Sequence, residues 1–264
     1  MATGDQFALL NGQRLHWTDS GGSGPVVLLS HGFLMDHTMF DPQVAALAPE
    51  FRVITWDERG FGATEFDGKP FDYWDSARDA FALLDHLGVD SAVVGGMSQG
   101  GFLSLRMALL APERIRGLVL IDTQAGAEDP TQAETYRDML EAWATVGPGE
   151  GLAGVVAQLI IGDPEIEAVW IARWQQADPA LIVEPGRCLL ERDDISGRLV
   201  EITCPALVIH GDEDSAIEMP AAQALAAGLV GAGEVFVVEG AAHAANLTHP
   251  ERVNFALLHF LHHL

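Results

Sequence analysis

Residues 92–110 join a short apolar run to a helix-like run through a glycine-rich turn that carries one serine. The centre of the turn reads Gly-Met-Ser-Gln-Gly, and the serine is Ser98. A strand, a sharp turn and a helix form the context in which Gly-x-Ser-x-Gly makes a nucleophile elbow. Glycines leave room for a strained backbone, and the helix N-terminus favours developing negative charge. The simpler alternative is a glycine-rich turn in which Ser98 only caps the helix.

Apolar runs alternate with helical patterns along most of the chain, which predicts an α/β fold. An Asn-Gly pair separates runs at 7–10 and 15–18, so we expect these first two strands to be antiparallel. The later runs are continuously apolar, as expected for a mostly parallel sheet with helices on both faces. These runs occupy 25–30, 51–56, 92–96, 115–121, 205–210 and 235–238, and the helical patterns between and after them occupy 39–47, 76–87, 102–110, 219–229 and 250–263.

The alternation stops between residues 126 and 199, where helical patterns occur without a convincing strand. These patterns cover 131–145, 150–161, 165–177 and 180–191. We therefore predict a core formed by 1–125 and 200–264, with a helical cap inserted at 126–199. Function should lie at the carboxyl ends of the strands. The cap contains Trp143, Trp170 and Trp174, which either line a substrate pocket or pack the cap against the core.

Three loops at predicted strand ends carry the side chains needed for nucleophilic catalysis by serine. Ser98 follows a middle strand, Asp214 lies in the Gly-Asp-Glu-Asp stretch after a late strand, and His243 follows the next strand. A serine hydroxyl is a poor nucleophile until a base removes its proton, and histidine can do so at neutral pH. A carboxylate then fixes the imidazole tautomer and stabilises its cation. Asp212 competes with Asp214 for the role of the acid.

With these motifs the chain resembles the α/β-hydrolase fold superfamily, in the group of small serine esterases and enol-lactonases. The matching stretches are 31–33 (His-Gly-Phe), 57–62 (Asp-Glu-Arg-Gly-Phe-Gly), 96–100, 211–214 and 240–243. The family pattern places the acid three residues after the glycine, which favours Asp214 and leaves Asp212 as a turn residue. A few members carry the acid after an earlier strand, which corresponds to Asp122 here.

The resemblance implies further site residues. It implies an oxyanion hole formed by the backbone N–H groups of Phe33 and Gln99, and a structural role for Asp57. We take Phe33, Met97 and Trp143 as candidate substrate-binding residues.

The implied activity is that of a serine hydrolase that cleaves small uncharged esters or lactones through an acyl-enzyme on Ser98. His243 would be the general base, oriented by Asp214, and no metal or cofactor is expected. The serine argues against dehalogenase-like and epoxide hydrolase-like members, which use aspartate at the elbow. Related triads also serve perhydrolases or haloperoxidases, acyl transfer and carbon–carbon bond cleavage, and some relatives are slow small-molecule receptors. These alternatives stay open.

The chain has 264 residues with 38 acidic and 14 basic side chains, giving a net charge of −24. Such a charge argues against nucleic acid, anionic membranes and anionic substrates as partners. No apolar run approaches the ~20 residues of a membrane span, and the N-terminus lacks a signal-like core, so we expect a cytoplasmic protein. Cys188 and Cys204 lack metal-binding spacing and are expected to be buried thiols, while a disulfide between them stays open from the sequence. The sequence leaves homo-oligomer formation open.

Overall fold

The computed structural model describes residues 3–264 and contains one eight-stranded sheet with the order β1-β2-β4-β3-β5-β6-β7-β8. Its first strands, β1 and β2, form an antiparallel hairpin, and β2 also runs antiparallel to β4. All other neighbours are parallel. The strands are β1 (Thr3–Leu10), β2 (Gln13–Asp19), β3 (Val26–Ser30), β4 (Arg52–Asp57), β5 (Ala92–Met97), β6 (Ile115–Ile121), β7 (Ala206–Gly211) and β8 (Phe236–Val238). The predicted sheet is thereby confirmed.

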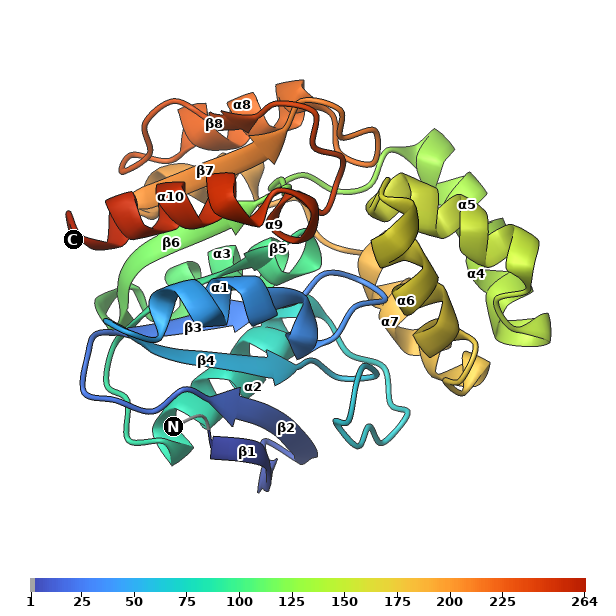
Figure 1. The fold of residues 1–264 in the computed structure, drawn as a ribbon, viewed down its shortest axis with the longest axis horizontal. Helices are drawn as coiled ribbons and strands as arrows, with labels where there is room; N and C mark the ends of the chain where they lie inside the picture. Colours follow the sequence, from blue (N-terminus) through green and yellow to red (C-terminus); the bar gives the residue numbers. More distant parts are fainter. Residues whose placement is uncertain (1–2) are drawn as a thin grey trace.

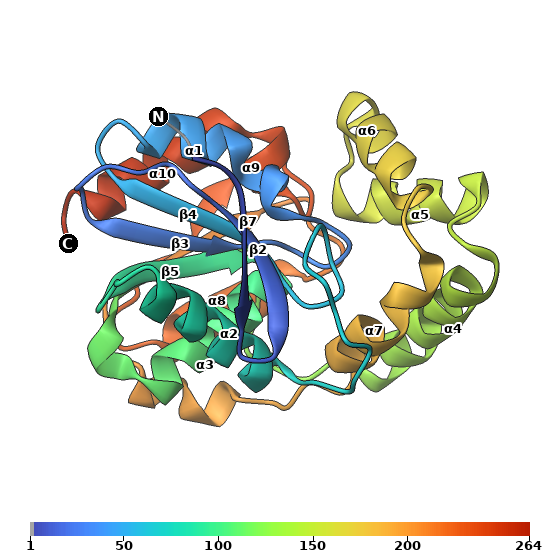
Figure 2. The same ribbon diagram turned by 90° about the horizontal axis from the view of Figure 1, so that it is seen from below.

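Helices cover both faces of this sheet (Figures 1 and 2). One face carries α1 (Asp41–Leu47), the short α9 (Ala245–Thr248) and α10 (Pro250–Leu261). The opposite face carries α2 (Tyr73–His86), α3 (Gln99–Leu110) and α8 (Met219–Gly228). The sequence produces this arrangement because successive strand residues point to opposite faces and both faces are apolar.

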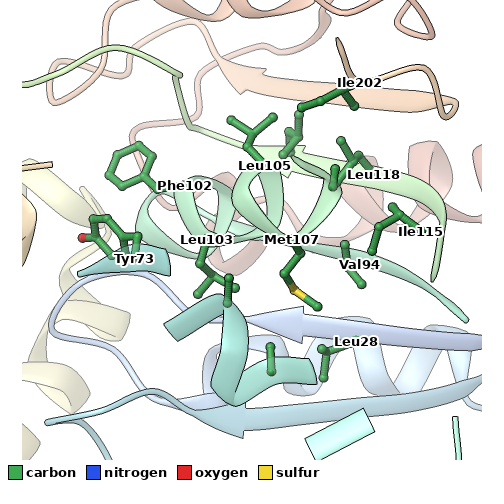
Figure 3. Close-up of a cluster of buried hydrophobic side chains, with 14 of the residues drawn as sticks. Leu28, Tyr73, Val94, Phe102, Leu103, Leu105, Met107, Ile115, Leu118 and Ile202 are labelled. Carbon is green, nitrogen blue, oxygen red and sulfur yellow. The ribbon is translucent and has the colours of Figure 1, made fainter. Parts of the chain in front are cut away.

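The central strands show this alternation directly. Val27 and Leu29 of β3 belong to the hydrophobic cluster under α1 and α10, whereas Leu28 belongs to the cluster under α2 and α3. Val93 and Val94 of β5 divide in the same way. Figure 3 shows how α3 packs its apolar residues between the sheet and its neighbours. Burial on both faces fixes the register of the strands and hence the positions of their carboxyl ends.

The segment between β6 and β7 is helical, and the described residues contain no strand there. It forms α4 (Pro130–Val146), α5 (Glu150–Ile160), α6 (Pro164–Trp174) and α7 (Val183–Leu190), which we call the cap helices. Asp129 and Asp163 cap α4 and α6 by accepting backbone N–H bonds. The predicted helix at 180–191 is instead a 3-10 turn (Pro179–Ile182) followed by α7. Asp178 and Pro179 start the turn, and Pro185 explains the break, because it has no N–H to donate to the Leu181 carbonyl.

The cap helices stand to one side of the sheet, beside the carboxyl ends of its parallel strands (Figures 1 and 2). Hydrogen bonds join the cap helices to the core. Trp174 Nε1 donates to the Leu34 carbonyl at 2.6 Å, and Arg187 Nη2 donates to the Phe71 carbonyl at 2.7 Å.

The domain boundaries at 125/126 and 199/200 stay a prediction. Cys188 and Cys204 are free thiols. Among the described residues, no helix combines the length and apolar character needed to cross a membrane.

Packing at the turn before α3 leads to a stability prediction. A Cβ added at Gly100 would collide with the carbonyl of Ser30 at the end of β3. Gly100→Ala should therefore lower the free energy of unfolding by about 3 kcal/mol. Chemical denaturation of the purified proteins measures this effect.

Gly154 on α5 is the matched control, because an added Cβ there meets nothing within 4 Å. Gly154→Ala should raise the free energy of unfolding by about 0.5–1 kcal/mol, since alanine favours the helix. Equal stability of Gly100→Ala and the unaltered protein would contradict the packing at the turn.

Candidate active site

Ser98 occupies the turn between β5 and α3 in a strained backbone conformation, with φ 52° and ψ −113°. A non-glycine residue adopts such a φ only when the surrounding structure enforces it. Here the Ser98 N–H donates to the Ile121 carbonyl at 2.9 Å, and Thr123 Oγ1 donates to the Ser98 carbonyl at 2.7 Å. The serine side chain makes no helix-capping hydrogen bond. The capping role therefore has no support, and within residues 3–264 the hydroxyl at the N-terminus of α3 has no hydrogen-bond partner.

His243 and Asp214 come from the loops after β8 and β7, and the structure brings them together. His243 Nδ1 lies 2.8 Å from Asp214 Oδ2, and both residues are buried. The other Asp214 oxygen accepts the N–H groups of Ala216 and Ile217 at 2.9 and 3.0 Å. These bonds orient the carboxylate, which in turn fixes the histidine ring with Nε2 as its free nitrogen.

Charge in this pair shifts both pKa values. Burial alone would lower the pKa of His243, but the charge and hydrogen bond of Asp214 outweigh it, so the pKa lies above its ordinary value. Burial alone would raise the pKa of Asp214, yet the His243 interactions and the Ile217 N–H bond lower it. The arrangement stabilises an imidazolium, which is what a base needs after it accepts a proton.

Asp122, the alternative acid, ends β6 but serves other partners. Its two oxygens accept the N–H groups of Gly211 and Ala245 at 2.8 and 3.1 Å, so it joins the loops after β7 and β8. Burial and the nearby Asp214 charge raise the pKa of Asp122 to about 8. Asp212, the other competitor, accepts the Gly240 N–H at 2.7 Å at the surface. Neither residue makes a hydrogen bond with His243, so Asp214 is the only one of the three that does.

The candidate oxyanion donors are the residue that follows Ser98 and a residue that lines the same cavity. Gln99 is the first residue of α3, and Phe33 follows β3 in a loop where Leu34 has a φ of 65°. His31 braces that loop, donating from Nδ1 to the Gly32 carbonyl and accepting the Glu58 N–H at Nε2, at 2.8 and 3.0 Å. Among described residues, neither the Phe33 nor the Gln99 N–H donates to a protein acceptor.

Asp57 sits at the carboxyl end of β4 and binds the chain around it. Its oxygens accept from the ring Nδ1 atoms of His16 and His37 at 2.7 and 2.8 Å, and from the backbone N–H groups of His37 and Ala63 at 2.8 Å. Burial opposes the charge, but these donors hold the pKa of Asp57 well below its ordinary value. A carboxylate so fully occupied fits the structural role expected for it.

Three groups of side chains offer ligand atoms within 4.8 Å of one another among the described residues. They are Asp5 with His16 and His37, Asp36 with His37 and Asp57, and Asp122 with His210 and Asp214. Asp57, Asp122 and Asp214 already bind N–H donors through both oxygens. We therefore assign neither of the two groups that contain these aspartates as a metal centre.

One cavity contains the candidate nucleophile and base. It has a volume of about 80 Å³ and is lined by Phe33, Met97, Ser98 and His243, together with apolar residues of α4 and α5. Trp143 does not line it. This residue packs edge-on against Trp174 at 5.7 Å and lines a neighbouring cavity of about 510 Å³, so the pocket role expected for it is not supported. Its large ring is needed instead to fill the space between cap and core.

Polar residues of the segment between β6 and β7 also line the cavity around Ser98, and the sequence analysis missed them. They are Gln124, Glu128, Tyr136 and Arg192. Nothing in the local pattern distinguishes Arg192 from the other charged residues near it, since only the folded cap turns its side chain inward.

Comparisons with known proteins find the same overall fold in several hydrolases. The sequence profile of the alpha/beta hydrolase fold matches residues 25–148. The structure is similar to an esterase from Thermogutta terrifontis, solved with malate bound, at 29% identity over 99% of both chains and a TM-score of 0.90. It is also similar to the enol-lactonase from Burkholderia xenovorans, at 27% identity over 97% of this chain and all of the other, with a TM-score of 0.88.

A relative from Azorhizobium caulinodans, provisionally named a carbamate hydrolase, is 31% identical over 90% of this chain and 92% of its own length. Another relative, from Synechocystis, is provisionally named a non-heme chloroperoxidase and is 29% identical over 94% of each chain. With its sheet, its elbow and these relatives, the chain belongs to the α/β-hydrolase fold superfamily.

Proposed function

We propose that this protein is a serine hydrolase that cleaves small carboxylic esters or lactones through an acyl-enzyme on Ser98. The observation that carries the proposal is the 2.8 Å hydrogen bond between His243 and Asp214, beside Ser98 in a single cavity. An oriented histidine with an ion-paired carboxylate is the group that a serine nucleophile requires. The esterase and enol-lactonase neighbours support the same class of reaction.

In the proposed mechanism, His243 Nε2 removes the Ser98 proton as Oγ attacks the substrate carbonyl carbon. The N–H groups of Phe33 and Gln99 donate to the oxygen that becomes negative, and the N-terminus of α3 adds favourable potential. His243 then returns the proton to the leaving alkoxide, and an acyl-enzyme forms. Water attacks this ester with His243 again as base, which releases the acid and restores Ser98.

The cavity favours short acyl groups. Its volume of about 80 Å³ lies well below the ~300 Å³ at the lower end of common ligand sites. Its walls are mainly apolar, and the protein carries a net charge of −24. A small neutral ester or lactone meets both conditions, while a long acyl chain exceeds the volume and an anionic ester is disfavoured by the apolar walls and the negative charge of the protein.

Ser98→Ala should lower kcat/KM for p-nitrophenyl butyrate by at least about a thousandfold, because serine and histidine act as one unit. The unaltered protein should prefer acetyl and butyryl esters to the palmitoyl ester. Initial rates across this acyl series measure both effects, with thermal unfolding to show that the variant is folded.

Retention of more than a tenth of the activity by Ser98→Ala would exclude it as the nucleophile. A single stoichiometric release of nitrophenol would instead identify a slow receptor-like member. Halogenation with peroxide at rates above ester hydrolysis would favour the haloperoxidase-like alternative, and a clear preference for palmitoyl would contradict the substrate proposal.

The two buried aspartates near His243 should respond differently to isosteric change. Asp214→Asn removes the carboxylate that binds His243 and should lower kcat about ten-thousandfold. The pKa of Asp122 is raised to about 8, so this carboxyl is mostly uncharged at neutral pH. Asp122→Asn therefore removes little charge and should lower kcat less than tenfold. Steady-state kinetics on the same butyryl ester compare them, and the reverse order of severity would place the acid on β6.

The pH profile should reflect the charge environment of His243. His243 can act as a base only when it is neutral. Burial would lower its pKa, but the interaction with Asp214 outweighs burial and raises it. Activity should therefore rise with pH, with a midpoint in kcat/KM above the ordinary histidine value of about 6.5. The residual activity of Asp214→Asn should have a lower midpoint. A flat profile of the unaltered protein between pH 5 and 8 would contradict a rate-limiting histidine base.

A further inference from the structure

Arg192 forms part of the wall of the cavity that contains Ser98 and His243, although its side chain is only 1% exposed. Its Nε donates to the Gly126 carbonyl at 3.0 Å. Its Nη1 donates to Glu128 Oε2 at 2.8 Å and to the Leu189 carbonyl at 2.9 Å. Nη2 is buried and has no hydrogen-bond partner among the described residues.

Arg106 shows that this chain does satisfy a buried guanidinium elsewhere. Its side chain is 2% exposed, and Nε, Nη1 and Nη2 all donate, to Asp193 and to the Phe102 carbonyl. Arg192 Nη2 thus lacks the acceptors that every guanidinium nitrogen of Arg106 has. Unpaired buried donors on a charged group are costly, so a partner such as water or a ligand is expected for them.

The surroundings define what can bind Nη2. A guanidinium only donates hydrogen bonds, so its partner must be an acceptor. Because Nε and Nη1 are already engaged, the usual two-pronged grip on a carboxylate is not available. Glu128 neutralises the charge of Arg192 and its side chain is only 9% exposed. An anion bound here would lie beside this buried carboxylate, which disfavours it.

We propose that Arg192 recognises a second, neutral carbonyl oxygen on the substrate, several bonds away from the ester or lactone that Ser98 attacks. The proposal rests on the function proposed above and narrows its substrate class to keto- or oxo-substituted esters and lactones. Phe102, which also lines the cavity, holds the guanidinium in place, with the Arg192 Cζ 4.6 Å from its ring centroid. Tyr136 lines the same cavity.

Binding to a Ser98→Ala protein tests this recognition without any turnover. Calorimetry would compare ethyl 4-oxopentanoate with ethyl pentanoate, and 3-oxobutyl butanoate with butyl butanoate. The two esters of each pair differ only in one carbonyl group. It lies on the acyl side in the first pair and on the alcohol side in the second. We expect the oxo ester of at least one pair to bind about tenfold tighter, as one hydrogen bond to a charged donor gives.

The same comparison in variants shows whether Arg192 is responsible. Arg192→Met combined with Glu128→Gln removes both charges and should bring the two affinities within twofold. Glu128→Gln alone is the matched control and should keep the tenfold preference, because the Nη2 donors remain. If the double variant does not melt as a folded protein, Arg192→Lys takes its place, since an ammonium on a shorter stem cannot put donors at Nη2.

Several results would overturn the inference. They are equal affinity within both pairs, a preference that survives the loss of Arg192, no measurable binding of any ester, or tighter binding of the monoethyl ester of glutaric acid than of the oxo esters. Hydrolysis is measured separately, in the protein that retains Ser98. Rapid hydrolysis of plain butyrate without any oxo preference refutes only the inference, whereas oxo-selective binding without Ser98-dependent turnover refutes only the proposed hydrolysis.

Discussion

The close approach of two glycines to the carbonyl of Ser30 is the contact on which the geometry around Ser98 depends. A Cβ at Gly96 or Gly100 would collide with this oxygen, so only glycine lets the turn before α3 lie against the end of β3. That contact brings Ser98 next to the loop that carries Phe33. The strain this requires is local: Leu34, Ser98 and Asp122 have positive φ, and all three follow strands at the same edge.

Buried carboxylates organise the loops around this edge, and identical side chains acquire different properties there. Asp57 and Asp214 bind histidines and keep pKa values below the ordinary one. Asp122 binds only backbone N–H groups and lies near the charge of Asp214, and its pKa is raised to about 8. Desolvation acts on all three, so the neighbours decide which carboxyl remains charged. Asp57 and Asp214 therefore stay charged beside histidines, and Asp214 does so beside His243.

The cap contacts the core in two places. Aromatic residues pack at one of them, and a buried ion pair lines the cavity at the other. Trp143 and Trp174 pack against each other and line the larger cavity, where Trp174 also bonds to the loop after β3. Glu128 and Arg192 line the smaller cavity with Ser98. Large aromatic rings gain most from filling a broad gap, while a buried charge needs its pair and its hydrogen bonds close at hand. The proposed chemistry and its selectivity therefore meet at the smaller cavity.

The sequence by itself determined the sheet, the helical segment between β6 and β7, and the elbow, because strand burial, helical periodicity and glycine spacing are local patterns. It also named Ser98, Asp214 and His243, since each follows a strand in a recognisable loop. Only the tertiary structure decided that Asp214, rather than Asp122 or Asp212, bonds to His243, because side-chain pairing across loops depends on where three strand ends meet. It likewise moved Trp143 away from the Ser98 cavity and brought Arg192 into it. Helical periodicity reveals which face of a cap helix is apolar, but the orientation of that helix over the sheet is fixed by packing between distant segments.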